Sequence, residues 1–172
     1  MKNKSSIIVR RFHFPCGEMI LGSFDGKICL CDWSDGISRN IIDFRLQKLQ
    51  NALYVDDGTT EVIETARQQL NEYFQRKRRE FDLPLLLVGS DFQKRVWDEL
   101  LAIPYGTTLS YGEMARRLGD RKAVRAVANA CAVNAISIIV PCHRVVGNNG
   151  KLVGYGGGLE RKRFLLDLEL EI

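Results

Sequence analysis

Alternating apolar and polar positions predict three short strands near the start of the chain. They cover Ile7–Val9, Glu18–Gly22 and Lys27–Cys31, which are apolar runs rich in residues that favour strands. Asp25-Gly26 separates the last two runs and is typical of a two-residue hairpin turn. The period then lengthens, and apolar side chains recurring every three to four residues predict a helix over Thr60–Arg79.

The pattern is interrupted between Phe81 and Val88. Pro84 lies inside this apolar stretch, which therefore indicates an edge strand or a linker. The basic run Arg76–Arg79 just before it is interpreted as the solvated end of the preceding helix. We place the domain boundary here, with an N-terminal domain over residues 1–87 and a second domain over residues 88–172.

Capping signals predict three helices in the second domain. Ser90-x-x-Gln93 and Ser110-x-x-Glu113 are capping boxes, each followed by an apolar stripe. The second of these helices ends at Gly119, and Asp120 is placed to cap a third helix that extends to about Cys131. Two short helices joined by a glycine-containing turn outline a helix-turn-helix.

The third helix is slim and basic. Lys122, Arg125 and Asn129 fall on one stripe, and alanines occupy much of the remainder. Such a helix can lie close to a phosphate backbone. An alanine-rich helix packed on its neighbour, with solvated charges, explains the same pattern. Further on, Arg144–Val153 predicts a hairpin that turns at Asn149-Gly150 and resembles the wing of a winged helix.

Pro141-Cys142-His143-Arg144 carries the candidate chemistry. The apolar run Ile136–Val140 predicts a buried strand that ends at this segment, where Pro141 stops pairing and poses the thiol. A thiol reacts as its thiolate, and His143 and Arg144 are the nearest groups to assist. Adjacent strand side chains face opposite ways, so His143 reaches Cys142 only across a turn or through a water. A buried thiol beside a surface histidine also fits this segment alone.

Two further features close the chain. Gly154–Gly158 is a loop with few side chains and many exposed N–H groups, suited to a ligand or to a flexible linker. Leu159–Leu170 predicts a final helix that bears Glu169 near its end.

Composition narrows the class of protein. Hydrophobic residues make up 45% and the net charge is +4, with no membrane-length apolar run and no leader-like start, so we expect no membrane association. Five irregularly spaced cysteines argue against a secreted disulfide framework and favour reduced thiols in the cytoplasm, or in the nucleus of a eukaryote. A metal site built from His13, Cys16, Cys29 and Cys31 is conceivable, but its spacing fits no usual zinc pattern, and we expect none.

The second domain resembles the O6-alkylguanine-DNA alkyltransferases, the methylated-DNA-protein-cysteine methyltransferases. The resemblance covers at least Phe92 to Glu169 and rests on segments that match in order and spacing: Pro104-Tyr105-Gly106-Thr107-Thr108-x-Ser110-Tyr111, Arg125-Ala126-Val127, Asn134, Pro141-Cys142-His143-Arg144-Val145, Gly154-Tyr155-x-Gly157-Gly158-Leu159 and Arg161-Lys162-x-x-Leu165-Leu166. It implies an α+β fold: a small N-terminal αβ domain with an antiparallel sheet, and a helical C-terminal domain with a winged helix-turn-helix.

The resemblance also implies a reaction and the residues that perform it. A guanine is flipped out of duplex DNA and its O6-alkyl group is displaced onto Cys142. His143 acts through a water as the base for Cys142, and Glu169 orients His143. Tyr111 protonates or hydrogen-bonds N3 of the leaving guanine, and Asn134 braces the turn near Cys142.

The resemblance places the remaining contacts on the basic helix and the glycine loop. By resemblance, Arg125 fills the gap left by the flipped nucleotide, and together with Ala126 and with Lys122 and Asn129 of the basic stripe it forms the surface expected to face DNA. Backbone groups read the edge of the base, in a pocket formed by Val145, Tyr155, Gly156 and Gly157. The implied partner is double-stranded DNA containing alkylated guanine, bound by a monomer without a cofactor.

Because a thioether is a poor leaving group, the implied protein acts once. O4-alkylthymine is a further substrate that the family leaves open. Three rival functions remain: a damage sensor that binds alkylguanine without transfer, a winged-helix transcription regulator, and a cysteine hydrolase. A transcription regulator would have no use for the thiol of Cys142, the imidazole of His143 or the carboxylate of Glu169. A cysteine hydrolase requires an oxyanion hole and repeated turnover.

Overall fold

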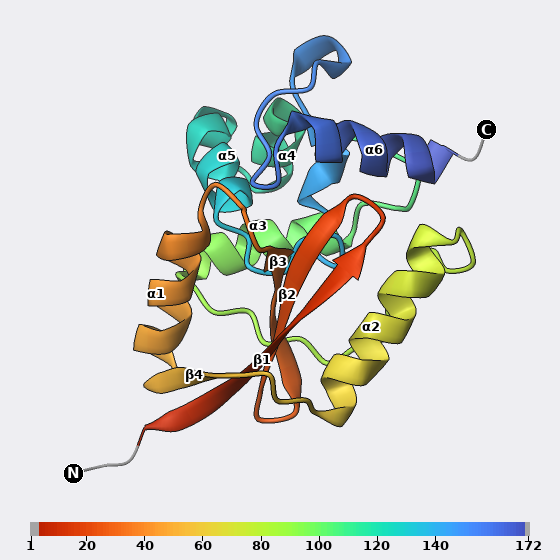
Figure 1. The fold of residues 1–172 in the computed structure, drawn as a ribbon. Coiled ribbons are helices and arrows are strands. Elements are labelled where there is room, and N and C mark those ends of the chain that lie inside the picture. Colours follow the sequence, from red (N-terminus) through yellow and green to blue (C-terminus); the bar gives the residue numbers. More distant parts are fainter. Residues whose placement is uncertain (1–3, 171–172) are drawn as a thin grey trace.

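A four-stranded sheet forms the centre of the first half in a computed structural model that describes residues 4–170 (Figure 1). Strands β1 (Ser5–Phe14), β2 (Gly17–Phe24) and β3 (Lys27–Trp33) run antiparallel, with Asp25 and Gly26 at positive φ in the predicted hairpin turn. Strand β4 (Ala52–Asp56) pairs parallel with β1. The α+β class is confirmed, but the sheet is mixed rather than antiparallel.

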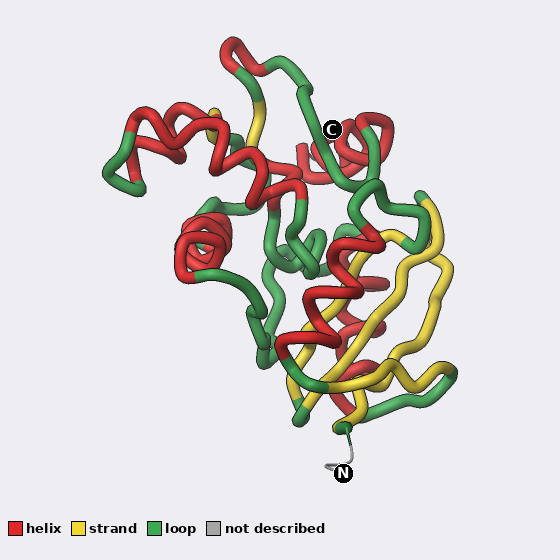
Figure 2. The backbone as a smooth tube through the Cα atoms, turned by 90° about the vertical axis from the view of Figure 1, so that its left-hand side faces the viewer, coloured by secondary structure: helices red, strands yellow, loops and turns green. Residues whose placement is uncertain are grey.

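Two helices flank this sheet on opposite sides (Figures 1 and 2). They are α1 (Arg39–Leu49) and α2 (Glu61–Phe74). The sequence pattern predicted neither α1 nor β4. Only Ile42 and Leu46 of α1 are buried, whereas Ile41 and Phe44 are exposed, so this helix has no clear apolar stripe to recognise.

Helix α2 is shorter than predicted. Arg76 adopts a positive φ of 59°, and the N–H of Lys77 donates to the carbonyl of Glu72 at 2.8 Å, which closes the helix end. The basic run therefore lies beyond the end of α2 and not in its last turn, whereas Arg76, Lys77 and Arg79 are exposed, as predicted. Arg76 Nε also donates to the Leu168 carbonyl, and the Arg79 guanidinium lies over the Tyr105 ring.

A linker leads from α2 to the second half along the free edge of β3. The N–H of Ile28 donates to the Pro84 carbonyl at 2.9 Å, and the N–H of Leu86 donates to the Ile28 carbonyl at 2.8 Å. Pro84, which has no N–H, thus contributes only its acceptor, as expected for an edge position. The segment is therefore a linker that forms a single β-bridge with β3, so it has features of both predicted alternatives, an edge strand and a linker.

Four helices build the second half: α3 (Asp91–Leu101), α4 (Tyr111–Arg117), α5 (Val124–Ala132) and α6 (Leu159–Leu170). The full capping box at Ser90 is present, and the Ser110 hydroxyl accepts from the N–H of Glu113. One predicted boundary is wrong. Asp120 caps a separate 3₁₀ turn, Arg121–Ala123, so α5 begins later and Lys122 precedes it.

The apolar run before Pro141 is not the predicted strand. Residues 137–140 form tight turns, with Ile138 at a φ of 71° and the N–H of Ile139 donating to the Ser137 carbonyl at 2.9 Å. The N–H of Ser137 is itself bound to the Cys31 carbonyl of β3, which draws the chain out of an extended path. The run is nevertheless buried, as predicted.

The predicted wing hairpin is also wrong in its strands. Asn149 and Gly150 do form a turn at positive φ, and the N–H of Gly147 donates to the Lys151 carbonyl at 2.8 Å. The flanking strand β6 (Val145–Val146) pairs parallel with β5 (Leu109–Ser110) instead of antiparallel with the returning chain. The turn is therefore a loop that projects beyond the helices at the top of Figure 1.

The buried side chains of both halves form one continuous core that includes Trp33 of β3 and Trp97 of α3. No helix among residues 4–170 is long and apolar enough to cross a bilayer.

Candidate active site

A pocket of about 800 Å³ opens between α4, α5 and the glycine loop. Cys142 lies at its wall and is only 4% exposed. The sequence-predicted residues Tyr111, Lys122, Arg125 and Tyr155 line the same pocket, together with Val124, Ala128, Cys131, Ala132, Val153 and Gly154.

The thiol of Cys142 is held in place by Asn134. The Asn134 amide nitrogen donates to Cys142 Sγ at 3.3 Å and to the Val140 carbonyl at 2.9 Å, while its oxygen accepts from the N–H of Ile136 at 2.9 Å. This single side chain therefore ties the turn before Cys142 to the sulfur. Burial raises the pKa of the Cys142 thiol to about 11, an effect opposed by the Asn134 hydrogen bond and by the charge of Lys162.

His143, the residue after Cys142, forms a buried pair with Glu169. His143 is fully buried, and its Nε2 lies 3.0 Å from Glu169 Oε2. Arg144 binds the other oxygen of this carboxylate, with Nε at 2.8 Å from Oε1, and its Nη1 donates to the Ile103 carbonyl at 2.7 Å. Arg144 therefore orients Glu169, whereas the sequence suggested that it assists the thiol.

The pKa values of this pair fix the tautomer of His143. Burial by itself raises the pKa of Glu169, yet the hydrogen bonds and charges of His143 and Arg144 leave it lowered, so the carboxylate is ionised and only accepts. Nε2 therefore carries the proton. Burial lowers the pKa of His143, which leaves the ring neutral at pH 7 with Nδ1 as a base. Nδ1 has no hydrogen-bond partner within residues 4–170.

Lys162 is a cation whose charge acts on the Cys142 thiol, and sequence reasoning missed it. It is fully buried on α6, and its Nζ donates to the carbonyls of Val153 and Gly154 at 3.2 and 3.0 Å. Burial lowers the pKa of Lys162, while a charge on Cys142 raises it. Its position three residues before the buried Leu165 was the available signal, because that spacing places a lysine on the apolar stripe of the helix.

Tyr111 begins α4 at the pocket wall. Its hydroxyl donates to the Val153 carbonyl at 3.2 Å, and Lys162 Nζ lies 5.6 Å from the ring centroid. Burial raises the pKa of Tyr111, so the hydroxyl remains protonated and can donate at neutral pH.

The residues predicted to face DNA all lie on the surface. Lys122 precedes α5, and Arg125, Ala126 and Asn129 are exposed along it. Lys122 and Arg125 reach the mouth of the pocket, whereas Ala126 and Asn129 do not line it. One exposed surface therefore joins the basic helix to the opening above Cys142.

The predicted base pocket is only partly assembled from the expected residues. Tyr155 lines the pocket, but Val145 is fully buried in β6, and neither Gly156 nor Gly157 is part of the wall. Gly157 instead lies against Trp33, where an added Cβ would meet the indole Cδ1 at 2.4 Å. The wall contains Cys131 at the end of α5, a position that helical spacing alone did not distinguish from the core.

All five cysteines are free thiols. Within residues 4–170, no group of three or more histidine, cysteine, aspartate or glutamate side chains is placed to hold a metal ion.

A buried thiol in a pocket wall, an imidazole–carboxylate pair at the next residue and an exposed basic helix form an arrangement that can serve a DNA-binding protein with a reactive cysteine. Two family profiles match the chain: "6-O-methylguanine DNA methyltransferase, ribonuclease-like domain" over residues 11–87 and "6-O-methylguanine DNA methyltransferase, DNA binding domain" over residues 91–171. The chain belongs to this family, which confirms the resemblance seen in the sequence.

Individual relatives agree with this assignment. A methylated-DNA–protein-cysteine methyltransferase of Mycobacterium tuberculosis is 60% identical over 104 residues, which span 60% of this chain and 63% of the relative. A probable enzyme of the same name from Acanthamoeba polyphaga mimivirus is 42% identical over 83% of this chain and 96% of its own length. The crystal structure of M. tuberculosis OGT in complex with DNA superimposes with a TM-score of 0.82, at 42% identity, over 95% of this chain and 92% of that chain.

Proposed function

We propose that the protein repairs O6-alkylguanine in double-stranded DNA by moving the alkyl group onto Cys142. The thiolate attacks the alkyl carbon, the S–C bond forms as the C–O6 bond breaks, and guanine leaves with the electron pair. The observation that carries this proposal is the placement of Cys142 in the wall of a pocket of about 800 Å³ that opens beside the exposed basic helix. Family membership supports it, since relatives carry the name of this activity.

In this proposal the proton of the Cys142 thiol moves away from the pocket. His143 Nδ1 takes the thiol proton through a water, and Glu169 stabilises the imidazolium that forms at 3.0 Å from its Oε2. The cationic Lys162 favours the thiolate, because its charge lowers the pKa of Cys142. Arg144 keeps Glu169 ionised and fixed in direction.

The leaving guanine receives its proton or a hydrogen bond from Tyr111. Tyr111 lines the pocket and its hydroxyl donates to the Val153 carbonyl, and in this proposal that donor turns to an acceptor such as guanine N3 when the base is bound. Asn134 keeps Sγ aimed at the pocket by the contact at 3.3 Å. The protein supplies the thiolate and the DNA supplies the alkyl group, so the reaction needs no cofactor. The free thiols suit the reducing cytoplasm, or the nucleus of a eukaryote.

Lys122 and Arg125 are assigned different tasks at the mouth of the pocket. Lys122→Ala should weaken binding to all DNA and lower the salt slope by about one unit, because one counterion fewer is released. Arg125→Ala should lose the energy that offsets unstacking, roughly a few kcal/mol, since Arg125 fills the space of the flipped nucleotide. Transfer from duplex O6-methylguanine should then fall far more than transfer from free O6-benzylguanine. Equal losses with both substrates would show that Arg125 supports the pocket or the fold instead.

Stoichiometry tests the proposed function against its rivals. With an excess of single-lesion duplex, the amount of restored guanine should equal the amount of protein and then stop, because nothing converts the thioether at Cys142 back to the thiol. Continued turnover would indicate a hydrolase. Tight binding without restored guanine would indicate a damage sensor, and preference for an operator sequence over the lesion would indicate a regulator.

A further inference from the structure

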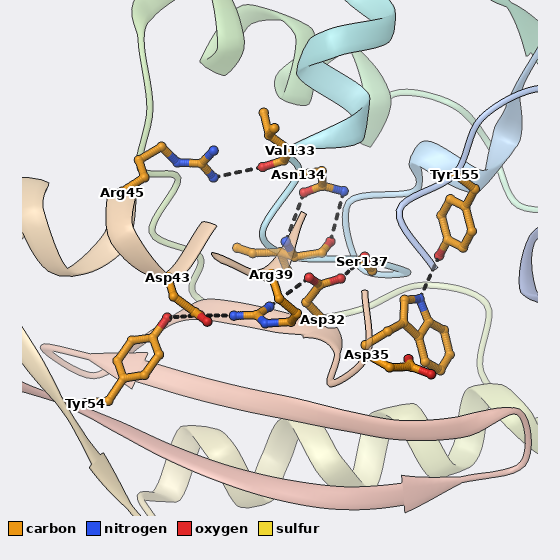
Figure 3. Close-up of polar contacts among 12 residues, drawn as sticks. Asp32, Asp35, Arg39, Asp43, Arg45, Tyr54, Val133, Asn134, Ser137 and Tyr155 are labelled. Carbon is orange, nitrogen blue, oxygen red and sulfur yellow. Dashed lines mark hydrogen bonds and ion pairs between the residues drawn. The ribbon is translucent and has the colours of Figure 1, made fainter. Parts of the chain in front are cut away.

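A series of buried polar contacts joins the first half of the protein to the segment before Cys142. Arg39 Nη1 donates to Asp32 Oδ2 at 2.8 Å, and the Ser137 hydroxyl donates to Asp32 Oδ1 at 3.0 Å (Figure 3). Asp32 is 3% exposed and Ser137 is 4% exposed. The carboxylate at the end of β3 therefore contacts a residue 105 positions further along the chain.

The next residue of β3, Trp33, contacts the pocket wall. Its indole Nε1 donates to the Tyr155 hydroxyl at 3.2 Å, and Tyr155 lines the pocket. The Asp32 carboxylate accepts from both Arg39 and the Ser137 hydroxyl, so the end of β3 contacts the segment before Cys142 as well as the pocket wall.

Ser137 adjoins a strained turn that leads to the acceptor. Ile138 lies at a φ of 71° between Ser137 and Ile139, whose N–H closes a three-residue turn on the Ser137 carbonyl. Branched side chains rarely adopt this backbone state, so the surroundings must hold it. The backbone of Cys31 contributes two anchors, by donating to the Ala135 carbonyl at 2.8 Å and accepting from the N–H of Ser137 at 2.6 Å.

The same part of the first half also holds the glycine loop and the end of α5. The N–H of Ile37 donates to the Gly156 carbonyl at 2.8 Å, and Arg45 Nη2 donates to the Val133 carbonyl at 2.9 Å (Figure 3). Asp32 and Arg39 lie within this segment, so the loops on both sides of Cys142 are attached to one rigid support. Arg39 is itself braced by a second carboxylate, Asp43.

We infer that Asp32 and Arg39 are positioning residues for alkyl transfer, which hold Ser137 so that the turn before Cys142 keeps its reactive arrangement. The inference rests on the proposed function and assigns part of it to the first half of the protein. A buried ion pair suits this task better than an apolar contact because it fixes direction as well as distance. Neither residue lines the pocket, so each acts through Ser137.

Asp32→Asn tests this role, because the amide keeps the shape and removes the charge that orders the series. At saturating duplex, the maximal rate of transfer to Cys142 should fall by about tenfold to a hundredfold, as expected for a misplaced reacting group. The dissociation constant for DNA should stay unchanged, since the exposed helix is not involved. Free O6-benzylguanine should react more slowly by a similar factor.

Ser137→Ala and the double variant separate positioning from general destabilisation. Ser137→Ala should slow transfer in the same way, and the double variant should be no slower than the slower single variant, because both changes break one series. Asp35→Asn is the matched control. It weakens another ion pair between the two halves, Asp35 with Arg161 at 2.6 Å, without touching Ser137 or Tyr155, and it should transfer at the parent rate.

The outcomes separate this inference from the proposed function. If the parent protein restores no guanine, the proposed function fails. If the parent transfers and folded Asp32→Asn matches its rate, the inference is overturned while the function stands. If Asp32→Asn does not fold, Ser137→Ala decides, and a parent-like rate there overturns the inference. A loss of rate that accompanies a proportional loss of DNA affinity also overturns it.

Discussion

Cys142→Ala should abolish alkyl transfer and leave binding to lesion-containing duplex intact. The substitution removes the sulfur that accepts the alkyl group, but the pocket wall and the exposed helix α5 remain. The truncated side chain is small, so we expect the turn braced by Asn134 to keep its backbone contacts at 2.9 Å with Val140 and Ile136. Transfer is measured as methyl incorporated into protein, and binding as the anisotropy of a labelled duplex.

Cys131→Ala is the matched control for that experiment. Cys131 lines the same pocket, but burial raises the pKa of its thiol further, and it has no imidazole–carboxylate pair behind it. This variant should transfer at close to the parent rate. Parent-like transfer by Cys142→Ala, with the methyl on Cys131, would mean that the acceptor is wrongly assigned.

His143→Ala should slow transfer by about 10²–10⁴-fold at neutral pH, the usual contribution of a general base. The Cys142 thiol, with its pKa near 11, is ionised in only about one molecule in ten thousand at pH 7 without help. The neutral ring of His143 provides that help, because its lowered pKa leaves it unprotonated. The measurement is the single-turnover rate with DNA saturating, so that weaker binding does not contribute.

The dependence of the transfer rate on pH tests whether His143 accepts the thiol proton. In His143→Ala, the thiolate must form by direct ionisation, so the rate should rise about tenfold per pH unit up to a pH near 11. The parent should depend less steeply on pH, because its thiol proton passes to His143 within the protein. Parallel profiles for parent and variant, or an unchanged rate at pH 7, would contradict the assignment of His143 as the base.

Local signals explain which parts of the fold the sequence predicted. The hairpin at Asp25-Gly26 and the caps at Ser90 and Ser110 are decided by neighbouring residues, and each is present in the structure. Errors arose where distant contacts decide the backbone. The turn at Ile138 depends on the carbonyl of Cys31, more than one hundred residues away, and an apolar run does not encode that contact.

The candidate site shows the same difference between local and distant information. Cys142, His143 and Glu169 were identified from the family resemblance, which rests on motifs that match in order and spacing along the chain. The partners that tune them come from elsewhere: Arg144 turns toward Glu169, Lys162 points inward from α6, and Asp32 reaches Ser137 from β3. Their roles depend on burial and direction, which periodicity alone cannot supply.

The central claim is most directly tested by locating the transferred group. The protein is incubated with a duplex that carries one O6-methylguanine, digested, and its peptides are weighed by mass spectrometry. We predict one added methyl, located on Cys142 by fragmentation of its peptide, none on the other four cysteines, and unmodified guanine in the recovered DNA. An unmodified Cys142 in a protein that binds the duplex, with the O6-methyl group still on the DNA, would contradict the account.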